Sequence, residues 1–189
     1  MKFKEGKIIK IVYVEKNKKK VPIIIRYPNK SDTKAVWKFY NKVIKETENL
    51  SRISPVSLKE EKKWLSDVMV KMKKNITVQL LVESNGKIIG SASLSIKNEE
   101  RRKHVGDFGI AILQEFTGLG IGKKLMIEIE KDTRKMGMKI MVLSVHGKNK
   151  IAQNLYRKMG FNVSGKIPES IKIKKGYDTN ITMYKVLKK

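Results

Sequence analysis

Cysteine is absent from the 189-residue sequence, and histidine occurs only twice, as His104 and His146. Without cysteine the chain has no disulfide bond, no thiolate metal ligand and no cysteine nucleophile. Two histidines are too few for the histidine clusters that hold most catalytic zinc ions. We therefore expect an enzyme or binding protein that works without a metal.

Long apolar runs are also missing. No stretch approaches the roughly 20 residues of a membrane span, and the N-terminal residues MKFKEGKIIK lack the apolar core of a signal peptide. We therefore expect a cytoplasmic protein without a membrane partner. With 40% hydrophobic residues, the length predicts a single domain over residues 1–189 that buries a sizeable core.

Acidic residues are few beside the basic ones, 18 against 43, so the formal net charge is +25. A balance this basic is typical of proteins that contact nucleic acid, ribosomes or other polyanions. The excess lysines are scattered along the whole chain, which also fits a solvated lysine-rich surface. Both interpretations stay open from composition alone.

The most informative stretch reads GIAILQEFTGLGIGKK and covers residues 109–124. A short apolar strand is followed by a turn with three glycines on alternate positions, and then by a helical pattern with Ile121, Leu125 and Ile129 four residues apart. Free backbone N–H groups at a helix N-terminus bind anions, and glycine lets a phosphate oxygen come close. The stretch predicts a phosphate site, with Lys123 and Lys124 beside it.

Two well-known phosphate loops fit this stretch poorly. A P-loop has four residues between its glycines, and a dinucleotide fingerprint reads Gly-x-Gly-x-x-Gly, whereas this loop reads Gly-x-Gly-x-Gly. The segment from Thr117 to Gly122 instead resembles motif A of the GNAT superfamily, the acetyl-CoA-dependent N-acetyltransferases, which reads Gln/Arg-x-x-Gly-x-Gly/Ala. It departs at the first position, where Thr117 replaces the usual Gln or Arg.

A second pattern, from Asn149 to Phe161, resembles motif B of the same superfamily, Asn-x-x-Ala-x-x-x-Tyr-x-x-x-Gly-Phe. Two motifs in the right order, roughly 30 residues apart, are more specific than either alone. The resemblance covers about residues 23–187. It implies that the Tyr156 hydroxyl approaches the CoA sulfur, that Asn149 contacts the pantetheine arm, and that Asn154 is a weaker candidate near the pyrophosphate.

The resemblance implies acetyl-CoA as co-substrate and a direct transfer in a ternary complex. The residues expected to bind it are Ala111, Ile112, Leu113, Thr117, Gly118, Leu119, Gly120, Ile121, Gly122, Lys123, Asn149, Asn154 and Tyr156. A backbone N–H near Ile112 or Leu113 is expected to stabilise the oxyanion of the tetrahedral intermediate. Tyr156 is expected to protonate or hydrogen-bond the leaving thiolate.

The general base is less clear in the sequence. Some members place a Glu at the start of the motif A strand, and Asp107 stands there in this chain. Another branch places a Glu on the next strand, where this chain has Ser144. We therefore predict Asp107 as the catalytic carboxylate, or else as a substrate-orienting or structural one. His146 is interpreted as a loop residue, and His104 as a solvated one.

The pattern of elements predicts a mixed α/β sheet of the α+β kind, mostly antiparallel and flanked by helices. Expected strands cover residues 7–14, 21–27, 76–83, 87–96, 105–113, 139–145, 161–164 and 180–187, with about residues 1–22 forming an added N-terminal edge strand. The run from Glu15 to Lys20 bridges the first two. Helices are expected after a cap at Ser31 or Asp32, after the capping box Ser57-x-x-Glu60 with Trp64 in its core stripe, behind the glycines, and from residue 148 to 159.

The expected acceptor is a primary amine, which can be a protein N-terminus, a lysine, a polyamine or another small amine. A cationic enzyme repels a free polyamine, which favours a protein acceptor, such as one associated with the ribosome. Residues 51–56, Tyr177 and Asp178 are predicted to border its site. The alternative is a non-catalytic module that binds nucleic acid or ribosomes through its charge, and the sequence leaves open a monomer or a homodimer.

Overall fold

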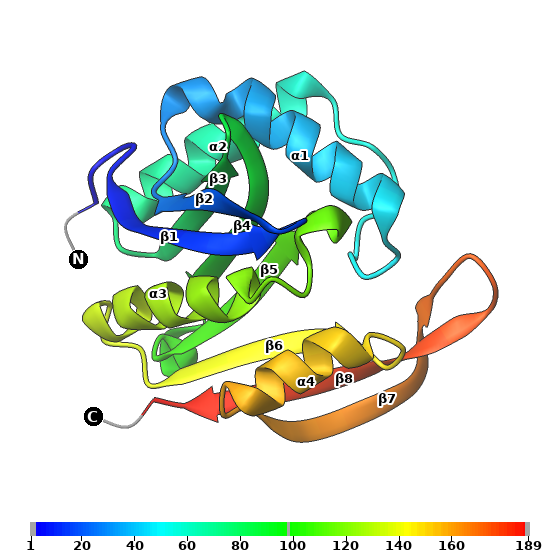
Figure 1. The fold of residues 1–189 in the computed structure, drawn as a ribbon. Coiled ribbons are helices and arrows are strands. Elements are labelled where there is room, and N and C mark those ends of the chain that lie inside the picture. The colour runs from blue at the N-terminus through cyan, green and yellow to red at the C-terminus, as the bar shows by residue number, and fades with distance from the viewer. Residues whose placement is uncertain (1–2, 98, 188–189) are drawn as a thin grey trace.

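The structure, a computed structural model, describes residues 3–97 and 99–187 (Figure 1). Two strands come first, then two helices, three strands, a helix, a strand, a helix and two strands, in the predicted order. The elements are β1 (Ile8–Lys16), β2 (Lys19–Arg26), α1 (Thr33–Glu46), α2 (Leu58–Lys73), β3 (Thr77–Ser84), β4 (Lys87–Ile96), β5 (Val105–Ile112), α3 (Ile121–Lys135), β6 (Ile140–His146), α4 (Lys150–Lys158), β7 (Asn162–Lys172) and β8 (Tyr177–Val186).

The eight strands form one sheet in the order β1-β2-β3-β4-β5-β6-β8-β7. Neighbours are antiparallel throughout, apart from the parallel pair of β5 and β6. The mixed, mostly antiparallel sheet was predicted correctly. β1 lies at one edge of it, and β7 at the other.

Helices cover both faces of the β1–β5 part of the sheet. Figure 1 shows α1 and α2 on one side of these strands and α3 on the other. β3 is buried on both faces because side chains alternate along a strand and each face has a helix layer. On β5, Phe108, Ile110 and Ile112 point to the α3 side, since Ile110 and Ile112 lie near Gly122 of α3. Asp107 and Gly109 therefore face the α1–α2 side.

The residues at two tight turns determine the geometry of the β1–β2 and β3–β4 hairpins. The turn at Asn85-Gly86 has positive φ angles of 48° and 70°, as the predicted Asn-Gly hairpin requires. The first hairpin turns at Asn17 and Lys18, with φ angles of 51° and 60°. The expected bridge from Glu15 to Lys20 was therefore too long, because β1 and β2 continue up to this two-residue turn.

The start of α2 was predicted correctly, and that of α1 in part. The capping box of α2 is present: the Glu60 amide donates to Ser57 Oγ at 3.2 Å, and the Ser57 amide donates to Glu60 Oε2 at 2.7 Å. The capping side chain before α1 is Asn29, which caps a 3₁₀ turn at Lys30–Asp32 that precedes the helix. Asp32 occupies the N-cap position of α1, as one of the two predicted alternatives had it, but its side chain makes no cap hydrogen bond because the carboxylate is paired with Arg26 at 2.8 Å.

Two further expectations were wrong. Trp64 of α2 is 40% exposed, although its neighbour Leu65 is buried in the core, so the apolar stripe is narrower than the sequence suggested. β7 runs to Lys172, well beyond the predicted end at Ser164. Register shifts on both sides of the segment from Gly165 to Ile167 absorb its irregularity, so the pairing with β8 continues where the sequence pattern suggested an end.

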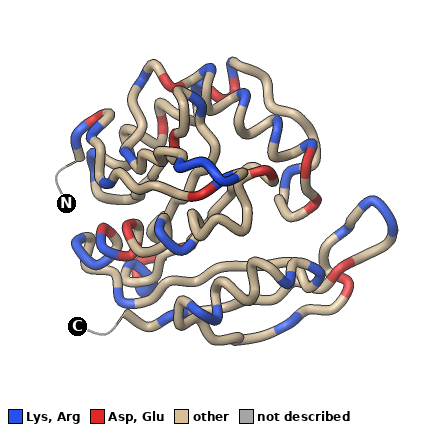
Figure 2. The backbone as a smooth tube through the Cα atoms, in the orientation of Figure 1, with Lys and Arg blue, Asp and Glu red and all other residues tan. Residues whose placement is uncertain are grey.

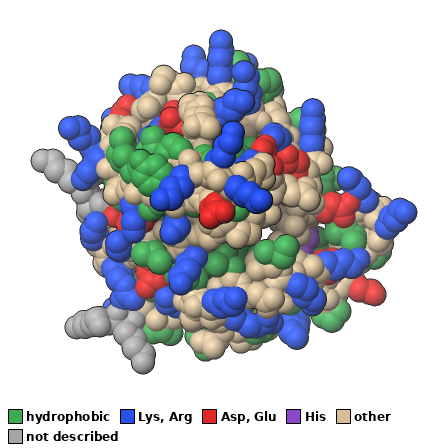
Figure 3. Space-filling model, viewed as in Figure 1, with side chains coloured by type: hydrophobic (Ala, Val, Ile, Leu, Met, Phe, Trp, Pro, Cys, Tyr) green, Lys and Arg blue, Asp and Glu red, His purple; other side chains and the backbone are tan. Residues whose placement is uncertain are grey.

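The basic charge is distributed over the molecule. Figure 2 shows Lys and Arg on almost every element, and Figure 3 shows them scattered across the visible face with a few acidic side chains among them. Several pair with these carboxylates, as Lys185 does with Glu130 at 2.6 Å. The distribution on this face is that of a solvated surface and shows no single basic stripe.

Candidate active site

β5 and β6 form a fork, because they pair only at one end. The pairing covers Val105–Asp107 of β5 and residues 140–142 of β6. Beyond it, β5 continues from Phe108 to Ile112 with hydrogen-bonded pairing to β4 on one side only. This leaves part of the backbone edge of β5 free to pair with an extended ligand.

The glycine loop lies beyond the tip of β5 and leads into α3. Gly118 and Gly120 have φ angles of 77° and 72°, and a Cβ built on either meets no atom within 4 Å. The open space at both positions is what a close phosphate needs. The first intrahelical bond of α3 runs from the Lys124 amide to the Gly120 carbonyl. The three amides of residues 121–123 precede this bond, so they have no carbonyl partner within the helix, an arrangement that is able to bind an anion.

The other residues of the loop have different contacts. The Thr117 hydroxyl donates to the Gln114 carbonyl at 2.8 Å, so it stabilises the turn, and Lys123 is exposed beside the site. Gly122 is buried, and a Cβ there would lie 2.9 Å from Leu155 Cδ2 of α4. Its missing side chain thus lets α3 and α4 approach each other across the fork.

Tyr156 lies on α4 and packs edge-on against Phe108 of β5, with ring centroids 6.3 Å apart. Phe161 packs against both rings. The Tyr156 side chain is 6% exposed, and burial raises the pKa of its phenol to about 12. Within residues 3–97 and 99–187, the buried side-chain polar atom left without a partner is Asn75 Oδ1, and the Tyr156 hydroxyl is not sealed in the core in this way. The phenol is therefore a protonated donor at neutral pH, held beside the strand that forms one arm of the fork.

Asn149, Asn154 and the Leu113 amide already have hydrogen-bond partners within the protein. Asn149 caps α4, because its Oδ1 accepts the Ala152 amide at 3.1 Å, and Asn154 is exposed on the same helix. The Leu113 amide donates to the Ile89 carbonyl at 2.9 Å. The expectation of an oxyanion donor near Ile112 or Leu113 was therefore wrong for Leu113, whose amide is already bonded to β4, and it stays a prediction for Ile112.

Asp107 lies at the closed end of the fork, in the last pair of the β5–β6 ladder. Its carboxylate pairs with Lys97 at 2.6 Å, and half of its side chain is exposed. It faces the α1–α2 side, opposite to Phe108 and the Tyr156 ring. The structure therefore separates the two predicted catalytic side chains by the thickness of the sheet.

The structure places His146, Asp178 and Gln153 close together, which the sequence pattern did not predict. His146 is the last residue of β6 and is buried, so its interpretation as a loop residue was wrong. Its Nδ1 lies 3.8 Å from Oδ2 of Asp178, a buried carboxylate on β8. Gln153 of α4 donates to the carbonyls of His146 and Gly147 at 2.9 and 2.8 Å. No local pattern signals these contacts, because they join β6, α4 and β8.

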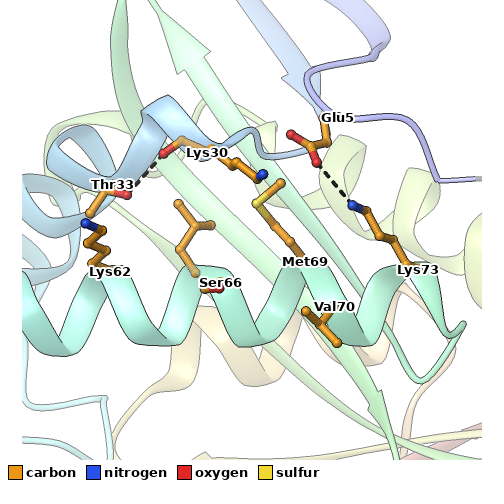
Figure 4. A pocket seen from close by; sticks show the side chains of 9 residues that line it. Glu5, Lys30, Thr33, Lys62, Ser66, Met69, Val70 and Lys73 are labelled. Atoms are coloured by element: carbon orange, nitrogen blue, oxygen red, sulfur yellow. Dashed lines mark hydrogen bonds and ion pairs between the residues drawn. The ribbon is translucent and has the colours of Figure 1, made fainter.

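A separate pocket lies between α2 and the start of α1 (Figure 4). Lys30, Lys62 and Met69 line it, and Lys73 pairs with Glu5 at its edge at 3.5 Å. None of its lining residues belongs to β5, α3 or α4. It is therefore distinct from the fork.

Two absences apply to the described part of the chain. No helix there is long and apolar enough to cross a membrane. No group of three or more His, Asp and Glu side chains in that part could hold a metal ion.

Comparison with known proteins gives consistent results. Residues 37–161 match the acetyltransferase (GNAT) family. The chain is 23% identical over 146 residues to the L-amino acid N-acyltransferase MnaT of Escherichia coli K12, covering 77% of this chain and 83% of that one.

Solved structures share the fold. A GNAT-family acetyltransferase from Streptococcus pneumoniae superposes with a TM-score of 0.80 at 25% identity, covering 87% of this chain and 99% of that one. The acetyltransferase yncA of Salmonella typhimurium, solved with its cofactor acetyl-CoA, gives 0.78 at 21% identity, covering 88% and 95%.

The open glycine cradle and the free strand edge fit the pyrophosphate and pantetheine of acetyl-CoA. The family match spans most of the chain and includes the glycine loop, β6 and α4. The protein belongs to the GNAT family and is an acetyl-CoA-dependent acetyltransferase that acts on amino groups.

Proposed function

We propose that this enzyme acetylates the α-amino group of a small amino-acid acceptor, with acetyl-CoA bound in the fork between β5 and β6. The observation that carries the binding site is the pair of open, positive-φ glycines at the start of α3. The amides of residues 121–123 would hold the pyrophosphate, with Lys123 beside them. The free edge of β5, at Ile112, would pair with the pantetheine amides.

The side chains of α4 would complete the site. Asn149 keeps the N-terminus of α4 in place, and Tyr156 presents a phenol to the sulfur of the thioester. As the C–S bond breaks, the thiolate would take the phenol proton, and the amine nitrogen would supply the replacement. A protonated phenol is suited to this step because a pKa of about 12 keeps it neutral at physiological pH.

The acceptor is proposed from the charge of the protein and from its relatives. A net charge of +25 disfavours a free polyamine and attracts an acceptor that carries a carboxylate. The relative MnaT, named for L-amino acids, matches over most of its length. A peptide N-terminus shares the α-amino chemistry, and it is the competing acceptor.

The acceptor class is tested by CoA release with three kinds of amine: L-amino acids, peptides that begin with alanine, and spermidine. We expect turnover with at least one L-amino acid and a weaker rate with spermidine. A preference for peptides would overturn the amino-acid acceptor and leave the acetyl-CoA site standing.

The acetyl-CoA site is tested by Gly120→Glu with Gly137→Glu as its matched control. Gly137 ends α3 with φ 76° and, like Gly120, has no atom within 4 Å of a built Cβ. Both variants carry the same backbone strain, about 1–2 kcal/mol, and the same added charge. Calorimetry should find acetyl-CoA binding lost in Gly120→Glu and retained in Gly137→Glu. Equal affinities in the two variants would exclude the glycine loop as the site.

A further inference from the structure

We propose that His146, oriented by Asp178, is the general base that removes the proton from the acceptor ammonium. This inference rests on the proposed function and adds a catalytic residue to it. The sequence pattern pointed to Asp107, yet that carboxylate is already paired with Lys97 at the closed end of the fork.

Strand register places His146 on the acceptor side of the sheet. Asp107 and Val142 are partners in the parallel ladder, so they point to the same face. Counting two residues at a time from Val142, His146 points to that face as well. The face is the one covered by α1 and α2, and His146 stands at the end of β6, where the two arms have separated.

The β7–β8 hairpin and the segment after α1 border this side. Lys174, in the turn between β7 and β8, lies 3.8 Å from Glu48, which follows α1. Figure 1 shows the same hairpin extending beyond the end of β6. An acceptor that enters between these two segments would pass the end of β6 on its way to the thioester.

Asp178 is suited to orient the imidazole. Asn180 stands opposite His146 in the β6–β8 ladder, so these two side chains share one face of the sheet. Asp178 precedes Asn180 by two residues on the same strand and therefore points to that face as well. Its carboxylate is fixed in place: Oδ1 accepts the Thr179 amide at 2.8 Å, and Oδ2 accepts the Lys148 amide at 3.1 Å. With Nδ1 turned to this carboxylate, Nε2 is left to take a proton, as in other histidine bases paired with Asp.

The 3.8 Å separation is an ion-pair distance, longer than a hydrogen bond. Catalytic hydrogen bonds are often long before substrate binds and shorten afterwards. Asp178 on β8 is the charged group beside the imidazole. Lys148, in the loop after β6, binds the same carboxylate through its backbone amide. Asp107 shares this face of the sheet, and Tyr156 lies on the opposite one. Among them, the described residues give His146 one close carboxylate.

The proton balance needs no further reactant. His146 Nε2 takes one proton from the acceptor ammonium and releases it to solvent. The neutral nitrogen then forms the C–N bond to the acetyl carbon, and the C–S bond breaks. The second proton lost by the nitrogen restores the Tyr156 phenol, whose own proton goes to the sulfur. The products are the N-acetylated acceptor, CoA thiol and one proton.

The kinetic test compares His146→Gln with His104→Gln, the matched control at the exposed second histidine. With the acceptor that gives the fastest CoA release in the panel above, we expect kcat/KM of His146→Gln to fall about 10²–10⁴-fold at neutral pH. Raising the pH should restore part of it, because more of the amine is then neutral. His104→Gln should match wild type. Activity of His146→Gln within threefold of wild type, with an unchanged pH profile, would overturn the proposal.

Acetyl transfer by the wild-type enzyme, measured in the same assay, tests the proposed function independently of His146.

A second measurement covers the case in which His146→Gln binds acetyl-CoA poorly or unfolds. In Asp178→Asn, kcat/KM should fall at neutral pH while the affinity for acetyl-CoA, measured by calorimetry, stays at the wild-type value. An unchanged kcat/KM in Asp178→Asn would remove Asp178 from the mechanism and overturn the proposed dyad.

Discussion

The ring of Tyr156 is buried, while its hydroxyl is not among the fully buried polar atoms that lack a partner. The hydroxyl therefore keeps some access to solvent at the end of a packed ring. Packing against Phe108 and Phe161 uses only the ring. The hydroxyl therefore fits a ligand that enters the fork.

Tyr156→Phe removes this hydroxyl and keeps the ring. We expect kcat to fall about 10²-fold, at the low end of general acid catalysis because a thiolate is already a fair leaving group. The Michaelis constants should hardly change, since the lost interaction belongs to the transition state. If the chemical step limits the rate and the turnover of Tyr156→Phe is still within twofold of wild type, Tyr156 has a packing role only.

The raised pKa of Tyr156 also predicts the alkaline limit of the enzyme. A phenol with a pKa of about 12 stays protonated through neutral pH, so deprotonation of Tyr156 should not reduce kcat below about pH 11. The folded pKa lies above the unfolded value of about 10. The stability that depends on the neutral phenol is therefore complete below pH 10 and is lost as the pH rises towards 12.

Among the helices and strands, the features that depend on residues close together in the sequence could be predicted. The Asn85-Gly86 turn and the Ser57–Glu60 capping box depend on neighbours in sequence, and both formed as expected. Asp32 stands at the predicted N-cap position of α1 but does not cap it with its side chain, because Arg26, in another element, binds its carboxylate. The same reason explains why the contact of His146 with Asp178 was missed.

Gly122 shows a second limit of motif reading. The resemblance placed it with the cofactor-binding glycines, while its buried position against Leu155 assigns it a packing role between α3 and α4. Whether it also contacts acetyl-CoA stays a prediction. A motif records which residue is needed at a position and not which of two physical reasons requires it.

Gly122→Ala should destabilise the fold on the order of 1 kcal/mol, because the new methyl group overlaps Leu155 Cδ2. In a Leu155→Ala background the same change should be neutral or stabilising by up to about 1 kcal/mol, since alanine favours a helix over glycine. Urea unfolding of the four proteins in this cycle gives the coupling energy. Additive effects would show that α3 and α4 do not meet through this pair.

At the scale of the whole molecule, the order of elements and the mixed sheet could be predicted because hydrophobic periodicity and turn residues carry that information. The fork could not be derived from periodicity, since it depends on how far two strands, joined through α3, stay paired. The sequence also left the meaning of the charge open. In the structure, Lys and Arg are spread over the surface and partly paired with carboxylates.

The short parallel ladder makes the fork a mechanical weak point. The β1–β5 and β6–β8 parts of the sheet are joined by strand pairing over only three residues on each strand, so thermal motion should separate these parts before either part unfolds. Acetyl-CoA, lying between the arms, would contact both and resist this separation.

Ligand binding and unfolding should therefore be coupled. Acetyl-CoA at 100 times its Kd should add about 2.7 kcal/mol to the free energy of unfolding, visible as a rise in Tm in a thermal melt. Hydrogen exchange should slow most at the free-edge amides of β5 and at the end of β6, and least at the outer strands β1 and β7. Uniform protection would mean that the two parts of the sheet open as a single cooperative body.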